Sequence, residues 1–354
     1  MTKPPLTQRG ALDNAVGRFE THDRQAEADA WWQEEPPPLK TKVIPDASRT
    51  IINRNGSPDI PFDQSINPYR GCEHGCVYCF ARPGHAYLGL SSGIDFETRL
   101  FVKPDAARLL EVALRKPGYR CSPIAIGTNT DPYQPIEREH RVMRGILEVL
   151  AAFRHPVSIV TKSALVARDV DILGAMAADR LAGVGVSITS LDGDLARRLE
   201  PRAPTPKRRL ETIMALAKAG VPVRVMAAPM IPGLNDHEME RILAAAAEAG
   251  ATAASWIHVR LPHDVKALFE QWLEHHRPDR KDKVLSLIRQ IRGGRLNDPN
   301  FGSRFRGSGP VAEMMEQRFR LAITKLGMAE RRIQPLRTDL FAPPPKKGDQ
   351  LSLL

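Results

Sequence analysis

A regular alternation of strand-like and helix-like segments constrains the fold of this chain more than any other feature. Five short runs rich in β-branched residues are predicted strands: 124–130, 157–161, 183–189, 223–230 and 254–259. Apolar residues recur at helical spacing in the segments around them, which predicts helices over 105–115, 140–152, 169–178, 207–219 and 238–249. With one more strand before the cysteine-rich loop, the chain has about six strand–helix units, so an α/β fold with a parallel sheet is predicted.

Three of the four cysteines lie close together, as Cys72, Cys76 and Cys79. A Cys-x3-Cys-x2-Cys run brings three thiolates from one short loop, whereas a cubane iron–sulfur cluster normally takes four. The spacing therefore predicts a [4Fe-4S] cluster with one iron open to another ligand. Cys121 lies at the start of an apolar run and is interpreted as a small buried hydrophobic residue.

Zinc is the alternative metal for this loop. His74 or His85 would complete a Cys3His set, although structural zinc sites usually combine a Cys-x2-Cys pair with a second, distant pair. The sequence contains no second pair. We therefore favour the cluster and interpret both histidines as residues that pack the loop or hydrogen-bond near it.

The cysteine loop and its surroundings resemble a known superfamily. The three cysteines with Tyr78 and Phe80, inside the longer stretch 65–89, are similar to the radical S-adenosylmethionine superfamily, in its bacterial branch related to spore photoproduct lyase. The similarity runs from about Ser48 into the last third of the chain. It implies a partial (β/α)6 TIM-like barrel with N- and C-terminal extensions, and S-adenosylmethionine bound to the open iron at the carboxyl ends of the strands.

Composition and pattern divide the chain into four parts. Residues 1–47 are polar and show no sustained period, as expected of a partly disordered arm. The remaining parts are expected to be the partial barrel, a helical extension with an Arg/Phe/Gly-rich loop, and a flexible tail: 48–262, 263–328 and 329–354.

The segment 127–131, at the end of the predicted strand that starts at residue 124, is rich in hydroxyl, amide and carboxylate groups. The resemblance implies that it holds the amino group of S-adenosylmethionine through Thr128, Asn129, Thr130 and Asp131. Asp131 is the strongest of the four predictions because a carboxylate offsets an ammonium. An Asx-type turn before Pro132 is the structural alternative.

Later strand ends supply the other predicted cofactor contacts. The resemblance implies that Lys162 and Ser163 meet the S-adenosylmethionine carboxylate, although a lysine at a strand end is usually solvated. Ser187 and Thr189 alternate onto one face and are expected to bond the ribose or the carboxylate, or else to fill a layer of the barrel. Ile231 is the expected apolar contact of the adenine. Two further residues are weaker candidates, with helix capping and a basic surface as the plain alternative: Glu200 and Arg202.

Charge and cysteine usage bound the surroundings of the protein. The net charge of +10 favours polyanions only weakly, because many basic proteins bind no nucleic acid. Segment 289–307 interleaves arginine, glycine and phenylalanine, so it either follows a phosphate backbone and stacks bases or closes one mouth of the barrel. Few cysteines and no long apolar stretch predict a protein of the reducing cytoplasm with no membrane partner.

The last five residues form a possible docking peptide. Gln350, Leu351, Ser352, Leu353 and Leu354 follow a proline- and lysine-containing linker and resemble the motif that binds the bacterial DNA sliding clamp. Phenylalanine is commoner at the final position, and a frayed terminus is the alternative.

The resemblance implies radical chemistry. An electron donor such as flavodoxin or ferredoxin would reduce the cluster, S-adenosylmethionine would be cleaved, and the resulting radical would abstract hydrogen from a substrate, possibly DNA or a nucleobase in repair. The lyase of this branch needs a hydrogen-donating cysteine in the loop matching 127–131, and this chain has none there. The alternative is a DNA-associated iron–sulfur adaptor or sensor without turnover.

Overall fold

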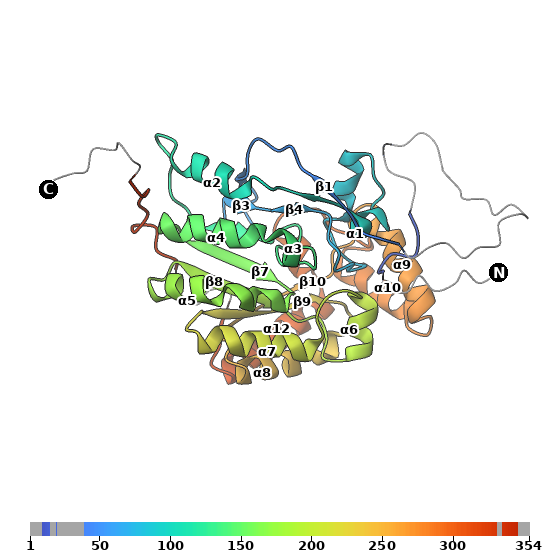
Figure 1. Ribbon diagram of the computed structural model, residues 1–354. Coiled ribbons are helices and arrows are strands. Elements are labelled where there is room, and N and C mark those ends of the chain that lie inside the picture. Colours follow the sequence, from blue (N-terminus) through green and yellow to red (C-terminus); the bar gives the residue numbers. More distant parts are fainter. Residues whose placement is uncertain (1–8, 15–18, 20–38, 331–334, 346–354) are drawn as a thin grey trace, which may run out of the picture.

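Among the described residues, eight strands form the main sheet, in the order β11-β10-β9-β8-β7-β6-β3-β2. The computed structural model describes residues 9–14, 19, 39–330 and 335–345 (Figure 1). Within this sheet, as far as the structure describes it, neighbouring strands from β3 to β11 are parallel and β2 pairs antiparallel with β3. The strands are β2 (Asn53–Arg54), β3 (Gln64–Ile66), β6 (Ile124–Ile126), β7 (Val157–Thr161), β8 (Ala182–Ser187), β9 (Val223–Met230), β10 (Ala253–His258) and β11 (Ala329–Glu330).

Helices follow the parallel strands, which confirms the predicted α/β fold. The helices that the sequence predicts are α2 (Ala106–Leu114), α4 (Val142–Ala152), α5 (Val170–Ala178), α7 (Pro206–Lys218) and α8 (Met239–Glu248). The helical extension contributes another long helix, α12 (Pro310–Lys325). The connections also contain η1 (Arg82–Leu88), α1 (Asp95–Thr98), α3 (Glu137–His140), η2 (Ala164–Asp169), α6 (Gly193–Leu199), η3 (Asp236–Glu238), α9 (Val265–His276), α10 (Lys281–Ile291) and α11 (Ser303–Arg306). A second sheet has the order β1-β5-β4, from Lys42–Pro45, Arg99–Val102 and Tyr69–Arg70.

Local chemistry explains where these elements begin and end. Helix α7 begins after Thr205, whose hydroxyl accepts a hydrogen bond from the amide of Arg208, and Pro206 occupies its first turn. Gly220, with φ of 76°, ends it. Strand β6 ends at Ile126, before the predicted end at residue 130, because Gly127 turns the chain with φ of 89°.

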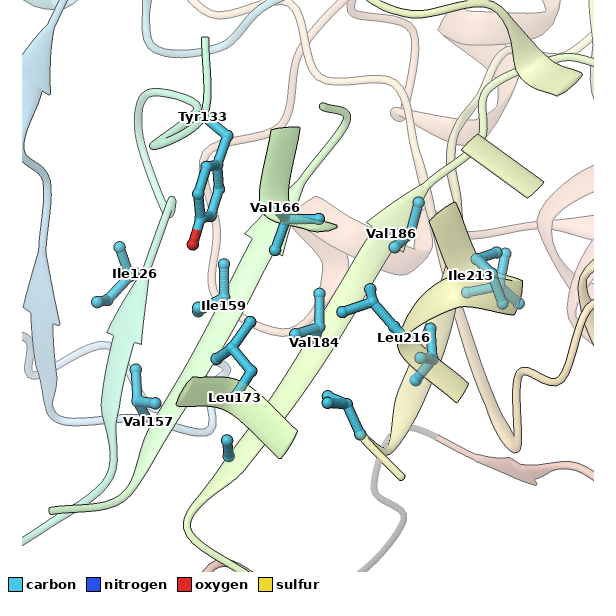
Figure 2. Packing of buried hydrophobic residues seen from close by; sticks show 14 of the residues in the cluster. Ile126, Tyr133, Val157, Ile159, Val166, Leu173, Val184, Val186, Ile213 and Leu216 are labelled. Atoms are coloured by element: carbon cyan, nitrogen blue, oxygen red, sulfur yellow. The ribbon is translucent and has the colours of Figure 1, made fainter. Parts of the chain in front are cut away.

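The main hydrophobic core lies between one face of the sheet and helices α4, α5 and α7, which cover it in Figure 1. Figure 2 shows Val157, Ile159, Val184 and Val186 from β7 and β8 packed against helix residues such as Leu173. Fully burying one such side chain stabilises the fold by about 1.5–3 kcal/mol. Because side chains alternate along a strand, the residues between these valines and isoleucines point to the opposite face of the sheet.

That opposite face of β8 carries small residues. Gly183, Gly185 and Ser187 alternate with the buried valines. A Cβ at Gly185 would lie 3.2 Å from the sulfur of Met226 on the neighbouring strand. The residues that β8 presents on this face are therefore small, in contrast to the valines on its helical face.

A second hydrophobic cluster supports the cysteine loop from the C-terminal helices. Cys76 and Val77 share it with residues of α9 and α10. Within it, Phe269 and Trp272 stack with ring centroids 5.9 Å apart, and the Trp272 indole N–H donates to the carbonyl of Arg198. The helices that follow β10 thus pack against the loop that carries the three cysteines.

Helix α11 bridges the two edges of the main sheet. It packs against β10, and Arg304 forms two hydrogen bonds, of 2.7 and 2.6 Å, with the carboxylate of Asp59, which lies between β2 and β3. The amide of Gly302 also donates to Asp59. No helix among the described residues combines the length and the apolar composition needed to cross a membrane.

Candidate metal and cofactor site

The cysteine loop has a backbone fixed by hydrogen bonds to distant segments. Cys72 and Cys76 are buried, and Cys79 is partly exposed. The Cys72 amide donates to the carbonyl of Phe96 at 2.9 Å, and the amide of Val77 donates to the carbonyl of Leu199 at 3.1 Å. The loop therefore presents its three thiols from a defined conformation.

Glycine is required inside the loop for a steric reason. Gly75 has φ of 67°, and a Cβ at this position would lie 2.6 Å from Oε2 of Glu97. A side chain there would need both a strained backbone and a shift of that carboxylate.

A buried ion pair holds the loop from below. The Arg82 guanidinium lies 2.5 Å from the Glu97 carboxylate, and both side chains are fully buried. Arg82 also donates to four backbone carbonyls, two in the cysteine loop and two in the turn before α1: Gly75, Cys76, Ser92 and Gly93. One side chain thus joins the loop to the next segment of the chain.

Residues near the N-terminus complete this arrangement. The amides of Gly10 and Ala11 each donate to the Glu97 carboxylate at 2.9 Å, and Arg9 donates to the Glu97 carbonyl. A Cβ at Gly10 would lie 1.7 Å from the carbonyl oxygen of Gly75. This part of the predicted arm therefore packs tightly on the cysteine loop.

The three thiols favour their neutral forms when no metal is bound. Burial raises the pKa of all three, to about 12 for Cys76, and for Cys72 the nearby Asp131 carboxylate adds to the effect. Metal binding needs the thiolate, so loading a cluster must release protons. Within the described segments, no three His, Cys, Asp or Glu side chains are placed to share a single metal ion. A cubane instead puts each thiolate on its own iron.

The two histidines near the loop have other partners. A ring nitrogen of His85 lies 2.9 Å from the Arg99 carbonyl, the ring packs edge-on against Phe96, and burial lowers its pKa. His74 is buried with Nδ1 3.4 Å from the Asp131 carboxylate. Both contacts agree with the interpretation of these residues as neighbours of the loop.

Glu200 is the centre of a buried polar network at the strand ends. Its carboxylate accepts hydrogen bonds from Thr189 at 2.6 Å, from Tyr78 and from Arg209, and Lys162 Nζ lies 4.0 Å away. Burial alone would raise the pKa of Glu200, but the charges of Arg209 and Lys162 outweigh it and hold the pKa at about 2. The network therefore joins the cysteine loop to the ends of β7 and β8.

Lys162 is the predicted cofactor residue with the most suitable charge. Burial acts to lower its pKa, but the Glu200 carboxylate and the Cys76 side chain reverse the direction, so the ammonium is retained. The alternation along β7 puts Lys162 on the face opposite Ile159, next to the cysteine loop. A cation at this point can pair with a carboxylate of a bound cofactor.

Asp131 is held by groups of the protein itself. Its carboxylate accepts from the Thr161 hydroxyl and from the amide of Lys162, both at 2.7 Å, and from the amide of Tyr133 at 2.9 Å. Burial alone would raise its pKa, but His74 and these donors lower it to about 2. Asp131 thus joins the end of β7 to His74 of the cysteine loop. Its bond from the Tyr133 amide is the one expected of an Asx-type turn, the structural alternative for this residue.

The other polar residues of this loop also have protein partners. The Thr130 hydroxyl donates to the Tyr69 carbonyl, and Asn67 bonds both the Thr128 hydroxyl and the Asn129 amide. Ser163 caps η2 by accepting from the Leu165 amide. The structure places these four predicted residues around the site, with hydrogen bonds that order its loops.

The remaining predicted cofactor contacts, Ser187, Thr189 and Ile231, lie in or near the Glu200 network and the cluster around Cys76. The Ser187 carbonyl accepts from Arg209, and the side chain follows Gly183 and Gly185 on the small-residue face. Thr189 bonds Glu200 directly. Ile231 is fully buried in the cluster that contains Cys76, and its amide donates to Asn235. Arg202 lies farther out, where it pairs with Glu73 of the cysteine loop at 3.0 Å.

Sequence reasoning missed several residues that support the site. Gln134 accepts from the Glu73 amide and donates to the Gly71 carbonyl, so one amide side chain brackets the start of the cysteine loop. Arg209, in the basic run that opens α7, is buried and pairs with Glu200. The Glu200–Pro–Arg202 run was a local signal for the network, whereas nothing in the sequence pointed to Gln134.

Comparison with known proteins identifies the family. The model of the Radical SAM superfamily matches residues 66–246. Uncharacterized proteins of Mycobacterium tuberculosis and Mycobacterium bovis are each 39% identical over 233 residues, which is 65% of this chain and 68% of theirs. Spore photoproduct lyase complexed with dinucleoside spore photoproduct superposes with a TM-score of 0.60, at 17% identity and 82% coverage of both chains. At that identity the superposition shows a shared fold.

These matches confirm the resemblance, the fold class and both cofactors expected from the sequence. The superfamily uses a [4Fe-4S] cluster and S-adenosylmethionine. The residues fit them: Cys72, Cys76 and Cys79 supply three thiols on one fixed loop, and Lys162 supplies an ammonium beside it. With these three thiols as ligands, S-adenosylmethionine would supply the remaining coordination of the cluster, so a fourth cysteine would not be needed.

Proposed function

This chain belongs to the radical S-adenosylmethionine superfamily, and we propose that it is an enzyme that abstracts hydrogen from a nucleic-acid substrate. When bound, the cluster and S-adenosylmethionine supply an electron and a 5′-deoxyadenosyl group that removes a hydrogen atom. Flavodoxin or ferredoxin in a reducing cytoplasm would be a suitable electron donor. The chain's own residues must bind and orient the cofactor and exclude water from it.

The observation that carries the proposal is the position of Lys162 between the Glu200 network and the cysteine loop. Its ammonium would pair with the cofactor carboxylate, while hydrogen bonds of Tyr78 and Thr189 to Glu200 fix the surrounding side chains. Ser187 and Thr189 remain the proposed hydroxyl contacts of the cofactor. Thr128, Asn129, Thr130 and Asp131 would act mainly by ordering the loop that lies against it.

Nucleic acid is the proposed substrate class for two reasons. The net charge of +10 and segment 289–307 favour a polyanion, and the lyase of similar fold was solved with a dinucleoside photoproduct. The loop 127–131 has no cysteine, so the reaction need not be the lyase reaction. The peptide 350–354 lies outside the described residues, and docking on the DNA sliding clamp remains a proposal for it.

Isotope transfer tests the substrate class. The reconstituted protein would be reduced anaerobically in the presence of S-adenosylmethionine and of nucleic acid purified from cells grown in deuterated medium. The deuterium content of 5′-deoxyadenosine and of S-adenosylmethionine would then be measured by mass spectrometry. Deuterium in either compound is expected. Peptides from the same cells are the matched control, and label from the peptides alone would overturn the proposal.

A further inference from the structure

Five side chains at the carboxyl end of the sheet stack as alternating rings and guanidinium groups. This aromatic–arginine ladder consists of Phe80, Arg260, Phe305, Arg304 and Phe301, in spatial order. The Arg260 guanidinium carbon lies 5.5 Å from the Phe80 ring centroid and 5.0 Å from that of Phe305. The Arg304 carbon lies 4.8 Å from the centroids of both Phe305 and Phe301. All four contacts are within cation–π range.

The ladder connects the cysteine loop to the open edge of the sheet. Phe80 directly follows the ligand Cys79, and Arg260 lies two residues after the end of β10. Phe301, Arg304 and Phe305 belong to the segment around α11, which bridges the sheet edges through Asp59. A molecule lying along the ladder would therefore lead from the protein surface to the metal site.

The rings at the two ends of the ladder are accessible. Phe80 is 40% exposed and Phe301 is 58% exposed, and α11 has no fully buried residue. Each of these two rings contacts one arginine of the ladder. Exposed aromatic rings are platforms on which unpaired bases stack, whatever their sequence.

The two arginines of the ladder differ in charge balance. Arg304 is paired with Asp59, but Arg260 has no carboxylate within 4.0 Å among the residues that the structure describes. Its Nε is buried without a hydrogen-bond partner in that part of the chain. Burial and the neighbouring Arg304 charge lower the pKa of Arg260, the more distant carboxylates of Asp59 and Asp298 act in the opposite direction, and the group remains a cation. An anion in direct contact with Arg260 would therefore stabilise a buried charge that is only partly balanced.

We propose that the aromatic–arginine ladder binds single-stranded nucleic acid, with Arg260 on a phosphate and Phe80 and Phe301 stacked on unpaired bases. This inference rests on the proposed function, because it describes how a nucleic-acid substrate reaches the cysteine loop. A single strand is required, since bases in a duplex have both faces covered by their neighbours. Chemistry on a base also requires that the base leave the stack.

Salt-dependent binding of a fluorescein-labelled single-stranded oligonucleotide tests the ladder. Fluorescence anisotropy would be measured anaerobically on reconstituted protein with matched iron content, for the wild type, R260Q, R260K and F301L. R108Q is the matched control, because Arg108 lies on α2 outside the ladder, with 65% of its side chain exposed. It loses the same charge.

Each variant has its own expected result. R260Q should weaken binding about tenfold and reduce the slope of log affinity against log salt by about 0.7, the value for one phosphate contact on a single strand. R260K should keep the slope but bind more weakly than the wild type, because lysine stacks less well. F301L should weaken binding about tenfold with an unchanged slope, and R108Q should match the wild type.

The outcomes separate the ladder from the proposed substrate class. If the wild type binds the oligonucleotide and R260Q and F301L bind it equally well, the ladder is wrong and the nucleic-acid substrate stands. If the wild type binds no oligonucleotide at low salt, the substrate class is overturned and the ladder with it. A loss for R108Q as large as that for R260Q would reduce the effect to net charge and would also refute the ladder.

Discussion

Neutralising Glu97 should weaken the hold on the metal site without touching a metal ligand. Glu97→Gln keeps the size of the side chain but replaces one acceptor oxygen by an NH2 donor. In the structure one carboxylate oxygen accepts from Arg82 and Ala11, and the other accepts from Gly10. A glutamine amide can satisfy only one of these two sets, so a donor will face a donor.

The expected magnitude follows from the burial of the pair. Arg82 and Glu97 are both fully buried at 2.5 Å, so solvent does not screen their interaction. Removing one charge from a buried pair destabilises by about 3–5 kcal/mol, because the other charge is left uncompensated. The Arg115–Glu111 pair is the matched comparison, with exposed side-chain fractions of 18% and 41% and the i,i+4 spacing of one helix. Such pairs contribute only about 0.3–0.5 kcal/mol.

The assay combines urea unfolding with release of iron to a chelator, both under anaerobic conditions on reconstituted protein. E97Q should lower the free energy of unfolding by about 3–5 kcal/mol and release iron faster than the wild type, whereas E111Q should do neither. Equal behaviour of E97Q and E111Q would refute the argument that the buried pair supports the cysteine loop.

Three further predictions concern the cofactor, pH and the tail. Lys162→Gln should weaken S-adenosylmethionine binding about tenfold or more, as expected for a lost charge-assisted bond, and equal dialysis binding by variant and wild type would contradict the cofactor contact. His155 is fully buried, and burial lowers its pKa from 6.5 to about 4. Between these two pH values the unfolded chain binds a proton that the folded chain does not, so the stability advantage of the wild type over H155L should shrink by about 1.4 kcal/mol per pH unit as the pH falls from 6.5 towards 4. A pH-independent difference in urea unfolding would argue against this prediction. Deleting residues 350–354 should abolish pull-down of purified sliding clamp while the iron content stays normal, and undiminished capture would exclude that peptide.

The sheet was predictable because its signals are local. Val157–Thr161 and Val223–Met230 have the predicted bounds, since β-branched residues alternate within each run and turn residues follow. The strand predicted over 124–130 ends at Ile126 in the structure. Threonine has a high strand propensity, so the residues after Gly127 read as strand although they form a turn.

The candidate metal ligands could be named from the sequence for the same reason, whereas the residues that support their loop could not. Three cysteines within one loop are a local pattern. Gly10 and Glu97 are far apart in the sequence, so no local pattern predicts their contact. Arg209 lies in a basic stretch, where nothing in the sequence indicates that it is buried against Glu200. The sequence names Asp131 as a contact of the cofactor amino group, and that stays a prediction; the structure shows that its oxygens accept hydrogen bonds from Thr161 and Lys162.

The most direct test of the account is reductive cleavage of S-adenosylmethionine by the reconstituted protein. With a strong reductant and no oxygen, the wild type should produce 5′-deoxyadenosine, and Cys76→Ala should produce none because the cluster loses one of its three thiolates. A wild-type protein with a full [4Fe-4S] cluster and bound S-adenosylmethionine that yields no 5′-deoxyadenosine, and returns no substrate hydrogen to the cofactor, would contradict the enzyme and favour an iron–sulfur adaptor or sensor.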